Sequence, residues 1–423
     1  MMTRLRLSLS TALASAMLLF AATLPGQAAP KLQELKRFDT PGDVAEIVAA
    51  SPDGKTLAYT NSEQKEIGFV NITNPSSPNM LGTTSVASYG EPTSVVITPN
   101  GQFAIAAVKN DPSSGKLVFI NFATRQIVGQ ISIGIGPDSI AITPDGRKVV
   151  IAIEDEEDTD NLPGQRPGAL DVVTINYSNP SQSQLRRVRF NLQGVPGINF
   201  KTDAQPEFVT ISQDGTTAAV TLQENNGIAL VNIAGNFPRV MRIFSGGIAE
   251  HLADTKDDKQ IAFVDPFRGR REPDAIGFSG NGRFLLTANE GDTALDTFGD
   301  GVWSGGRGWT IFDLQGRVVY DSGNTLEKAA AAKGLYPDGR SDNRGIEVEG
   351  LTVARFGTKQ YVFLVSERGS FLVVYDITNP RAPRLVDLKP TGTSPEGLIA
   401  IPDRKLVITA NEVEGNISIF EFK

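Results

Sequence analysis

Ser139-Ile140-Ala141-Ile142-Thr143-Pro144-Asp145-Gly146-Arg147-Lys148-Val149-Val150-Ile151-Ala152-Ile153 consists of two short β-branched runs joined by a Thr-Pro-Asp-Gly turn. Asp-Gly and Asn-Gly pairs between apolar runs favour a tight hairpin, because these residues tolerate the backbone angles that the turn needs. The stretch therefore predicts two antiparallel strands.

Equivalent turns recur along the chain, at Ser51-Pro52-Asp53-Gly54, Thr98-Pro99-Asn100-Gly101, Ser212-Gln213-Asp214-Gly215 and Ser279-Gly280-Asn281-Gly282. A third apolar run completes each of seven units, at residues 67–72, 117–122, 170–175, 228–233, 309–314, 371–377 and 417–422. A fourth run often follows, at residues 126–133, 239–244, 317–321 and 384–388.

Four short strands in units about 45 residues apart are typical of a β-propeller. The sequence thus predicts an all-β, seven-bladed β-propeller that forms a single domain over residues 29–423. An array of β-sandwiches is the alternative, but its units would be larger and would lack the common turn register. The last unit, residues 396–423, stops after its third strand, so we expect residues 32–38 to close it as an N-terminal strand.

Residues 1–28 predict an export signal. Arg4 and Arg6 precede an uncharged apolar segment, and a small-residue cleavage motif follows, which is typical of a secretory signal peptide. A retained membrane anchor is the alternative, but serine, threonine and alanine dilute the apolar segment. We expect cleavage near Ala29 and a periplasmic or extracellular protein with no membrane anchor after cleavage.

The composition excludes several kinds of site. The 423 residues include no cysteine and one histidine, His251, which excludes disulfides, thiolate ligands and multi-histidine zinc sites. Any hydrolytic chemistry must therefore use carboxylates, arginine, lysine and bound ions. The net charge of -8 argues against a nucleic-acid partner. We place His251 in a loop, without a catalytic role.

Carboxylates recur in two registers of the repeat. The first register directly precedes the first strand of a unit, and its acids are Glu46, Asp138, Glu207, Asp274, Glu349 and Glu396, with Thr93 in the second unit. The second register ends the second strand, and its acids are Glu154, Glu224, Glu290, Glu367 and Glu412, with Ser62 and Lys109 in the first two units.

Both registers are expected at one mouth of the central channel. A hairpin returns to the edge at which it began, and the first strand of each blade lines the channel. We expect the insertions at the same face, at residues 155–169, 178–205, 234–272, 291–308 and 322–346.

Carboxylates crowded around one opening repel each other, so their pKa values rise unless cations compensate. Oxygen ligands without histidine or cysteine favour Ca²⁺, or Mg²⁺ with retained waters. We therefore predict that the acids of both registers are metal ligands. The alternative at any single position is a carboxylate that only caps a turn by accepting backbone N–H bonds.

Two further charged segments leave their role open. Residues 154–160 are rich in acids and fit either a solvated loop or part of an ion site. Arg268, Arg270 and Arg271 fit either an anion site or a surface role.

A set of short motifs, in a fixed order, covers nearly all of residues 29–423. They are Gly90-Glu91-Pro92-Thr93-Ser94-Val95, Gly136-Pro137-Asp138, Gln205-Pro206-Glu207-Phe208-Val209, Leu222-Gln223-Glu224-Asn225-Asn226, Pro273-Asp274-Ala275-Ile276, Thr287-Ala288-Asn289-Glu290-Gly291-Asp292, Thr310-Ile311-Phe312-Asp313, Asp321-Ser322-Gly323, Arg340-Ser341-Asp342, Glu349-Gly350, Ser394-Pro395-Glu396-Gly397 and Ala410-Asn411-Glu412. With these motifs the chain resembles the choice-of-anchor I family of secreted propellers, which is related to an atypical cyanobacterial alkaline phosphatase.

The resemblance implies a calcium-using propeller with phosphomonoesterase activity in some members. The corresponding hypothesis is an alkaline phosphatase-like hydrolase of small-molecule phosphate esters, in which calcium activates the attacking water. Its catalytic carboxylates would be Glu207, Asp274 and Glu349, and Arg344 or Arg368 would hold the phosphate. The alternative is a non-catalytic, ion-stabilised binding protein. We expect a monomer in either case.

Overall fold

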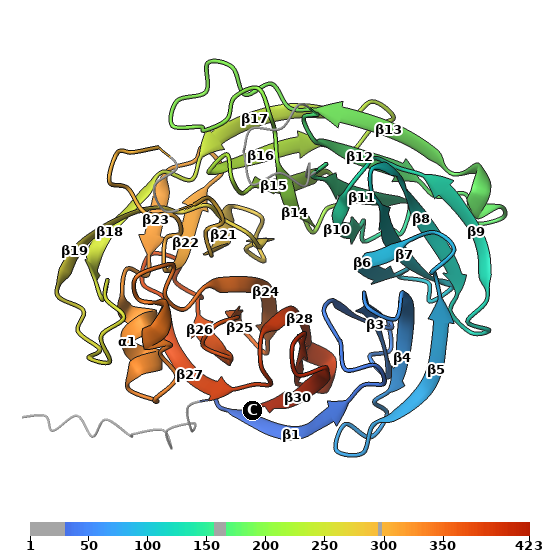
Figure 1. Ribbon diagram of the computed structural model, residues 1–423. Helices are drawn as coiled ribbons and strands as arrows, with labels where there is room; N and C mark the ends of the chain where they lie inside the picture. The colour runs from blue at the N-terminus through green and yellow to red at the C-terminus, as the bar shows by residue number, and fades with distance from the viewer. Residues whose placement is uncertain (1–29, 156–165, 295–297) are drawn as a thin grey trace, which may run out of the picture.

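The computed structural model describes residues 30–155, 166–294 and 298–423. These residues form seven four-stranded antiparallel blades arranged in a ring (Figure 1). The prediction of an all-β, seven-bladed propeller is thereby confirmed. The predicted signal peptide, residues 1–28, lies outside the described residues.

In every blade the strands follow one another from the channel outward. The first four blades are β2 (Val48–Ala50), β3 (Thr56–Asn61), β4 (Glu66–Asn71) and β5 (Asn79–Ser85); β6 (Glu91–Ile97), β7 (Phe103–Asn110), β8 (Ser113–Asn121) and β9 (Ile127–Ser132); β10 (Pro137–Ile142), β11 (Lys148–Ile153), β12 (Ala169–Thr174) and β13 (Gln184–Arg189); β14 (Pro206–Ile211), β15 (Thr217–Leu222), β16 (Gly227–Asn232) and β17 (Arg239–Ser245). The last three are β20 (Ile276–Phe278), β21 (Phe284–Asn289), β22 (Gly308–Asp313) and β23 (Val318–Asp321); β24 (Val348–Phe356), β25 (Lys359–Ser366), β26 (Phe371–Asp376) and β27 (Arg384–Pro390); β28 (Pro395–Ile401), β29 (Leu406–Asn411), β30 (Asn416–Phe422) and β1 (Leu32–Asp39).

The N-terminal strand closes the ring, as predicted. β1 pairs antiparallel with β30, from Leu32 opposite Phe422 to Asp39 opposite Asn416. The two ends of the chain thus share the seventh blade, which is visible where β1 lies beside β30 in Figure 1. Pairing β1 onto β30 covers the backbone N–H and C=O groups of β30 on that side.

The predicted hairpin turns form through their own side chains. Thr143 Oγ1 donates to Asp145 Oδ1 at 2.6 Å, and Asp145 Oδ1 also accepts from the Arg147 amide at 3.0 Å. Gly146 then takes a φ of 72°, which glycine adopts without the steric cost of a Cβ. The same arrangement joins β2 to β3, β14 to β15 and β20 to β21.

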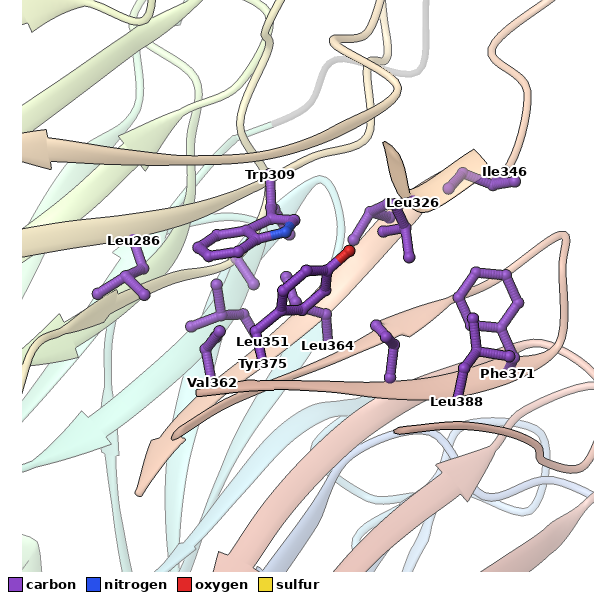
Figure 2. Close-up of a cluster of buried hydrophobic side chains, with 14 of the residues drawn as sticks. Leu286, Trp309, Leu326, Ile346, Leu351, Val362, Leu364, Phe371, Tyr375 and Leu388 are labelled. Carbon is purple, nitrogen blue, oxygen red and sulfur yellow. The ribbon is translucent and has the colours of Figure 1, made fainter. Parts of the chain in front are cut away.

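The hydrophobic core lies between adjacent blades. The second and third strands of each blade are nearly all buried, whereas the outer strands are largely exposed. Figure 2 shows the cluster between the fifth and sixth blades, in which Trp309 packs on Tyr375 with ring centroids 5.0 Å apart. Leu326 of the short helix α1 (Thr325–Ala331) extends this cluster.

Two predicted insertions differ from expectation. Residues 178–205 contain the fourth strand of the third blade, β13, which has few apolar residues because an outer strand faces solvent. Residues 234–272 contain β17 and an extra hairpin, β18 (Ile248–Ala253) and β19 (Asp265–Arg270), at the outer rim. These segments therefore do not lie wholly at the channel mouth, and His251 belongs to β18 rather than to a loop.

Candidate metal centre

Four of the six first-register acids lie at irregularities in the inner strands. The pairing register shifts between Pro137 and Ile140, and equivalent shifts occur in β14, β24 and β28 around Glu207, Glu349 and Glu396. A bulge turns a side chain away from the regular alternation of the sheet. In β10, β14 and β28 a proline directly precedes the acid, and a residue without an N–H suits a position where the ladder breaks.

Buried asparagines hold the turns that carry second-register acids. In the fifth blade, Asn289 Nδ2 donates to Thr310 Oγ1 at 2.8 Å and Asn289 Oδ1 accepts from Thr287 Oγ1 at 2.8 Å. In the seventh, Asn411 bonds Thr409 and Ser418 in the same way. Glu290 and Glu412 follow these asparagines directly, so their backbone positions are fixed by the core.

The inner ends of the strands enclose a cavity of about 370 Å³. Five of the six first-register acids line it together with Glu290 of the second register: Asp138, Glu207, Asp274, Glu349 and Glu396. We call this end of the channel, with these six carboxylates, the acidic mouth. The structure thus brings acids from five different blades to one opening, as the repeat register predicts.

Three groups of carboxylates approach closely enough to share an ion. They are Glu154, Glu207 and Glu224; Asp274, Glu290 and Glu349; and Glu290, Glu347 and Glu367. Within each group one oxygen per residue lies within 4.8 Å of the others. Ca²⁺ binds oxygens at about 2.3–2.6 Å, so two ligands of one ion lie at most about 5 Å apart. The spacing therefore fits a calcium ion in each group.

Burial and mutual repulsion raise the pKa values of several carboxyls in and beside the mouth. Desolvation is the main cause for Glu207, Glu224, Asp274, Glu349 and Glu396, whose pKa values lie well above the usual range. The pKa of Glu290 rises to about 8, mainly by desolvation and further by the charges of Glu367 and Glu347. An unliganded acidic mouth therefore opposes its own ionisation at neutral pH.

Several carboxylate oxygens in the mouth, or in the carboxylate group beside it, lack a hydrogen-bond donor within the described residues. Buried oxygens without a partner are Glu224 Oε2, Glu349 Oε2 and Glu396 Oε2. Glu224 is only 4% exposed, so water does not replace the missing donor from bulk solvent. A buried, unpaired carboxylate oxygen is costly unless a proton or a cation satisfies it, and the groups present fit a hard divalent cation.

The first two blades contribute little free negative charge. Glu46 accepts hydrogen bonds from Ser62 Oγ and, at 3.4 Å, from Thr60 Oγ1, and desolvation raises its pKa to about 7. Lys109 pairs with Glu91 at 3.3 Å. In the part of the chain that the structure describes, Glu46 and Glu412 do not line the cavity. Both donors to the Glu46 carboxylate are side-chain hydroxyls, so Glu46 does not show the backbone N–H capping of the turn-capping alternative.

Sequence reasoning missed Glu347 and its pairing with Arg340 and Arg368. Glu347 is 1% exposed and pairs with Arg340 Nε at 2.8 Å and with Arg368 Nε at 3.4 Å. Arg368 Nη1 also lies 3.0 Å from Glu367 Oε1. Two guanidinium groups thus offset two of the three carboxylates of the third group, which needs a metal ion less than the other two groups do. The alternating pattern Glu347-Val348-Glu349 is the signal that would have found it.

The other expected phosphate ligand, Arg344, braces a loop. Its Nη2 donates to the backbone oxygen of Asp292 and, at 3.5 Å, of Thr293. The same loop is held by Glu272, which accepts from the Asp292 amide at 2.9 Å and from Thr293 Oγ1 at 2.6 Å. Glu272 is satisfied by protein donors and was not predicted from the repeat.

The arginine cluster at 268–271 and the single histidine lie outside the mouth. Arg271 is buried and binds Asp321 Oδ2 through Nη2 at 2.7 Å, whereas Arg270 pairs with Asp300 and Arg268 with Glu250. Because all three arginines are paired with carboxylates, nothing here supports an anion site. Arg270 and Arg271 are buried, so the surface role expected from the sequence does not hold for these two residues. Of residues 154–160, only Glu154 and Asp155 lie within the described residues.

The fold and its mouth define a class: a seven-bladed propeller whose channel opens through an acid-rich end. The chain belongs to the choice-of-anchor I family, because the family profile matches residues 46–303 and 297–380. Choice-of-anchor domains are typical of exported proteins, which favours export here. Comparison with curated proteins found no match.

Solved structures share the architecture. Hydrazine synthase of Kuenenia stuttgartiensis matches with a TM-score of 0.61 and 17% identity, over 90% of this chain and 96% of that chain. A functionally unknown protein from Desulfotomaculum acetoxidans matches with 0.53 and 15% identity, over 88% and 91%. The Cps50 (Swd1) propeller domain of Myceliophteria thermophila matches with 0.57 and 10% identity, over 92% and 99%. At these identities the likeness concerns the fold alone.

Proposed function

We propose that this protein is an exported, calcium-dependent phosphomonoester hydrolase whose acidic mouth holds the cations. The observation that carries the proposal is the set of six carboxylates around one cavity. Burial raises the pKa values of five of them, Glu207, Asp274, Glu290, Glu349 and Glu396, and buried oxygens of Glu349 and Glu396 lack donors within the described residues. Such a mouth repels a phosphate ester when it is empty, so binding of the ester requires cations.

The groups around Glu207 and Asp274 would hold the cations, each with three carboxylates. A bound divalent cation supplies charge compensation for the phosphate and activates water. Arg368 is 42% exposed at its side chain and is held in place by Glu347 and Glu367. A guanidinium has five N–H donors, so Arg368 retains donors for a phosphate oxygen. Arg344 would act on the site by bracing the loop at Asp292.

Turnover of p-nitrophenyl phosphate by residues 29–423 tests the proposal. We expect activity with calcium, loss of activity in chelator, and recovery when calcium is restored. Mg²⁺ in place of Ca²⁺ tests which ion the mouth prefers.

Three variants locate the activity within the mouth. Glu207→Gln, Asp274→Asn and Glu349→Gln should each lower activity by at least about tenfold, because each removes charge from a cation ligand. His251→Ala is the control, because His251 lies in the outer hairpin and packs on Phe267. Full activity of the three mouth variants would contradict the proposed mechanism.

The second candidate is a non-catalytic, ion-stabilised binding protein. The observation that favours it is that both expected phosphate ligands already have protein partners, Arg368 with Glu347 and Arg344 with the backbone at 292–293. On this hypothesis calcium raises the melting temperature, as any ligand of the native state does, while no phosphate ester is hydrolysed.

A further inference from the structure

The cavity beneath the acidic mouth continues along apolar walls. In β10 it is lined from Asp138 to Ile142, and a strand rises about 3.3 Å per residue, so this wall runs for about 13 Å. The walls below the carboxylates are mainly aliphatic, from strands that surround the channel in Figure 1: Ala49, Val96, Ile142, Leu351 and Ile399. Phe208, next to Glu207, adds an aromatic wall.

The polar groups on these walls are already engaged. Ser94 Oγ accepts from the Ile140 amide and Ser139 Oγ accepts from the Val209 amide, both at 3.3 Å. Thr93 Oγ1 donates to the Pro137 backbone oxygen at 2.8 Å. Among the described residues that line the cavity, every charged side chain is one of the six carboxylates of the mouth. The cavity is therefore charged at one end and apolar along its depth.

We infer that the substrate class of this site is the amphipathic phosphate monoester, with the phosphate at the cation-loaded mouth and an alkyl or aryl group in the channel. This inference rests on the proposed function. The volume of about 370 Å³ lies within the range of small-molecule sites, and such sites combine apolar walls with a few polar groups that fix orientation. Burial of each methylene strengthens binding by about fourfold when the group is fully enclosed.

Alkylphosphonates, which are not hydrolysed, test the inference independently of turnover. Calorimetric titration of residues 29–423 in saturating calcium should give at least about tenfold tighter binding of hexylphosphonate than of methylphosphonate. In chelator both should bind at least about tenfold more weakly. Equal affinities for the two compounds in calcium would overturn the inference and leave the proposed function intact. Absence of binding by both compounds in calcium would overturn the proposed function and the inference together.

Channel variants locate the alkyl group. Ala49→Phe narrows the channel, so it should remove the preference for hexylphosphonate and leave methylphosphonate affinity unchanged. If that variant fails to fold, Val96→Thr combined with Ile142→Thr should reduce the preference by about threefold or more, because hydroxyls replace apolar groups on the wall. Val413→Thr is the matched control, since Val413 is 64% exposed. A preference that survives both channel changes would overturn the assignment.

Discussion

At the scale of single residues, the buried carboxylates in and beside the acidic mouth are unfavourable in the cation-free protein but suited to bind a cation. Without a cation, Glu224 keeps a buried oxygen that no protein donor reaches within the described residues, and burial and the charges of Glu154 and Asp292 oppose its ionisation. With a cation, the same oxygens are ligands. Replacing such an acid by its amide should therefore stabilise the cation-free protein and weaken ion binding.

Glu224→Gln should separate these two effects. In chelator the variant should melt at a higher temperature than the wild type, because glutamine removes the cost of burying or protonating a carboxylate whose pKa lies well above the usual range. In calcium titrations its affinity should fall by about tenfold or more, because a charged ligand is lost. Glu250→Gln, at an exposed position in the outer hairpin, is the control and should change neither quantity. A calcium affinity equal to that of the wild type would exclude Glu224 from the ion site.

The stability of the calcium-free protein should depend on pH. Carboxyls with a raised folded-state pKa bind protons more tightly in the native state, so they favour folding at low pH and lose that contribution as pH rises. The pKa values of Glu46 and Glu290 rise from 4.5 to about 7 and about 8. In chelator, the free energy of unfolding should therefore fall between about pH 4.5 and 8. Calcium should flatten this dependence, and urea denaturation at several pH values measures both effects.

At the scale of elements, the approach of neighbouring inner strands sets the mouth. Gly397 follows Glu396, and its amide donates to the Glu46 backbone oxygen at 2.9 Å. A Cβ at Gly397 would lie 2.3 Å from that oxygen, and one at Gly350 would lie 2.4 Å from the Glu396 oxygen. The Glu-Gly pairs of the sixth and seventh blades thus place an acid in the channel and let the next blade pack closely.

Gly397→Ala should destabilise the fold by about 1–3 kcal/mol through this overpacking. It should also weaken calcium binding, because the displaced backbone carries Glu396. Gly235→Ala is the matched control, since nothing lies within 4 Å of a Cβ there. Chemical denaturation of the two variants compares them, and equal free energies of unfolding would show that the inner strands adjust without cost.

Strands can be predicted from the sequence where an apolar run adjoins a turn motif. All seven third strands follow from apolar runs, and the first hairpin turns of five blades follow from Asp-Gly or Asn-Gly pairs. β13 escaped prediction because its sequence, Gln-Leu-Arg-Arg-Val-Arg, is that of an exposed outer strand. Glu347 escaped because it lies outside the two registers, and its pairing with Arg340 depends on an insertion whose path the repeat does not set.

At the scale of the whole molecule, the repeated units together predict a shared acidic cavity that no single unit predicts. Register alone places acids from separate blades around one cavity, because every blade presents its first strand to the channel. The register does not predict how charge is distributed among the blades. Ser62 binds Glu46 and Lys109 pairs with Glu91, so the first two blades have little free charge, whereas the carboxylate groups lie at the third to sixth blades. That asymmetry arises from particular side chains and gives separate groups of carboxylates instead of a uniform ring.

The last prediction concerns the closure of the ring by β1. Leu32 of β1 is 2% exposed and packs in a cluster with Phe363, Phe420 and Phe422. Leu32→Ala should lower the free energy of unfolding by about 2–3 kcal/mol, whereas Gln33→Ala, at an exposed position of the same strand, should have little effect.

Removal of residues 1–39 should expose the edge of β30 and produce oligomers in size-exclusion chromatography, because an unpaired strand edge is a template for pairing. A truncated chain that stays monomeric with an unchanged melting temperature would show that the propeller closes without β1.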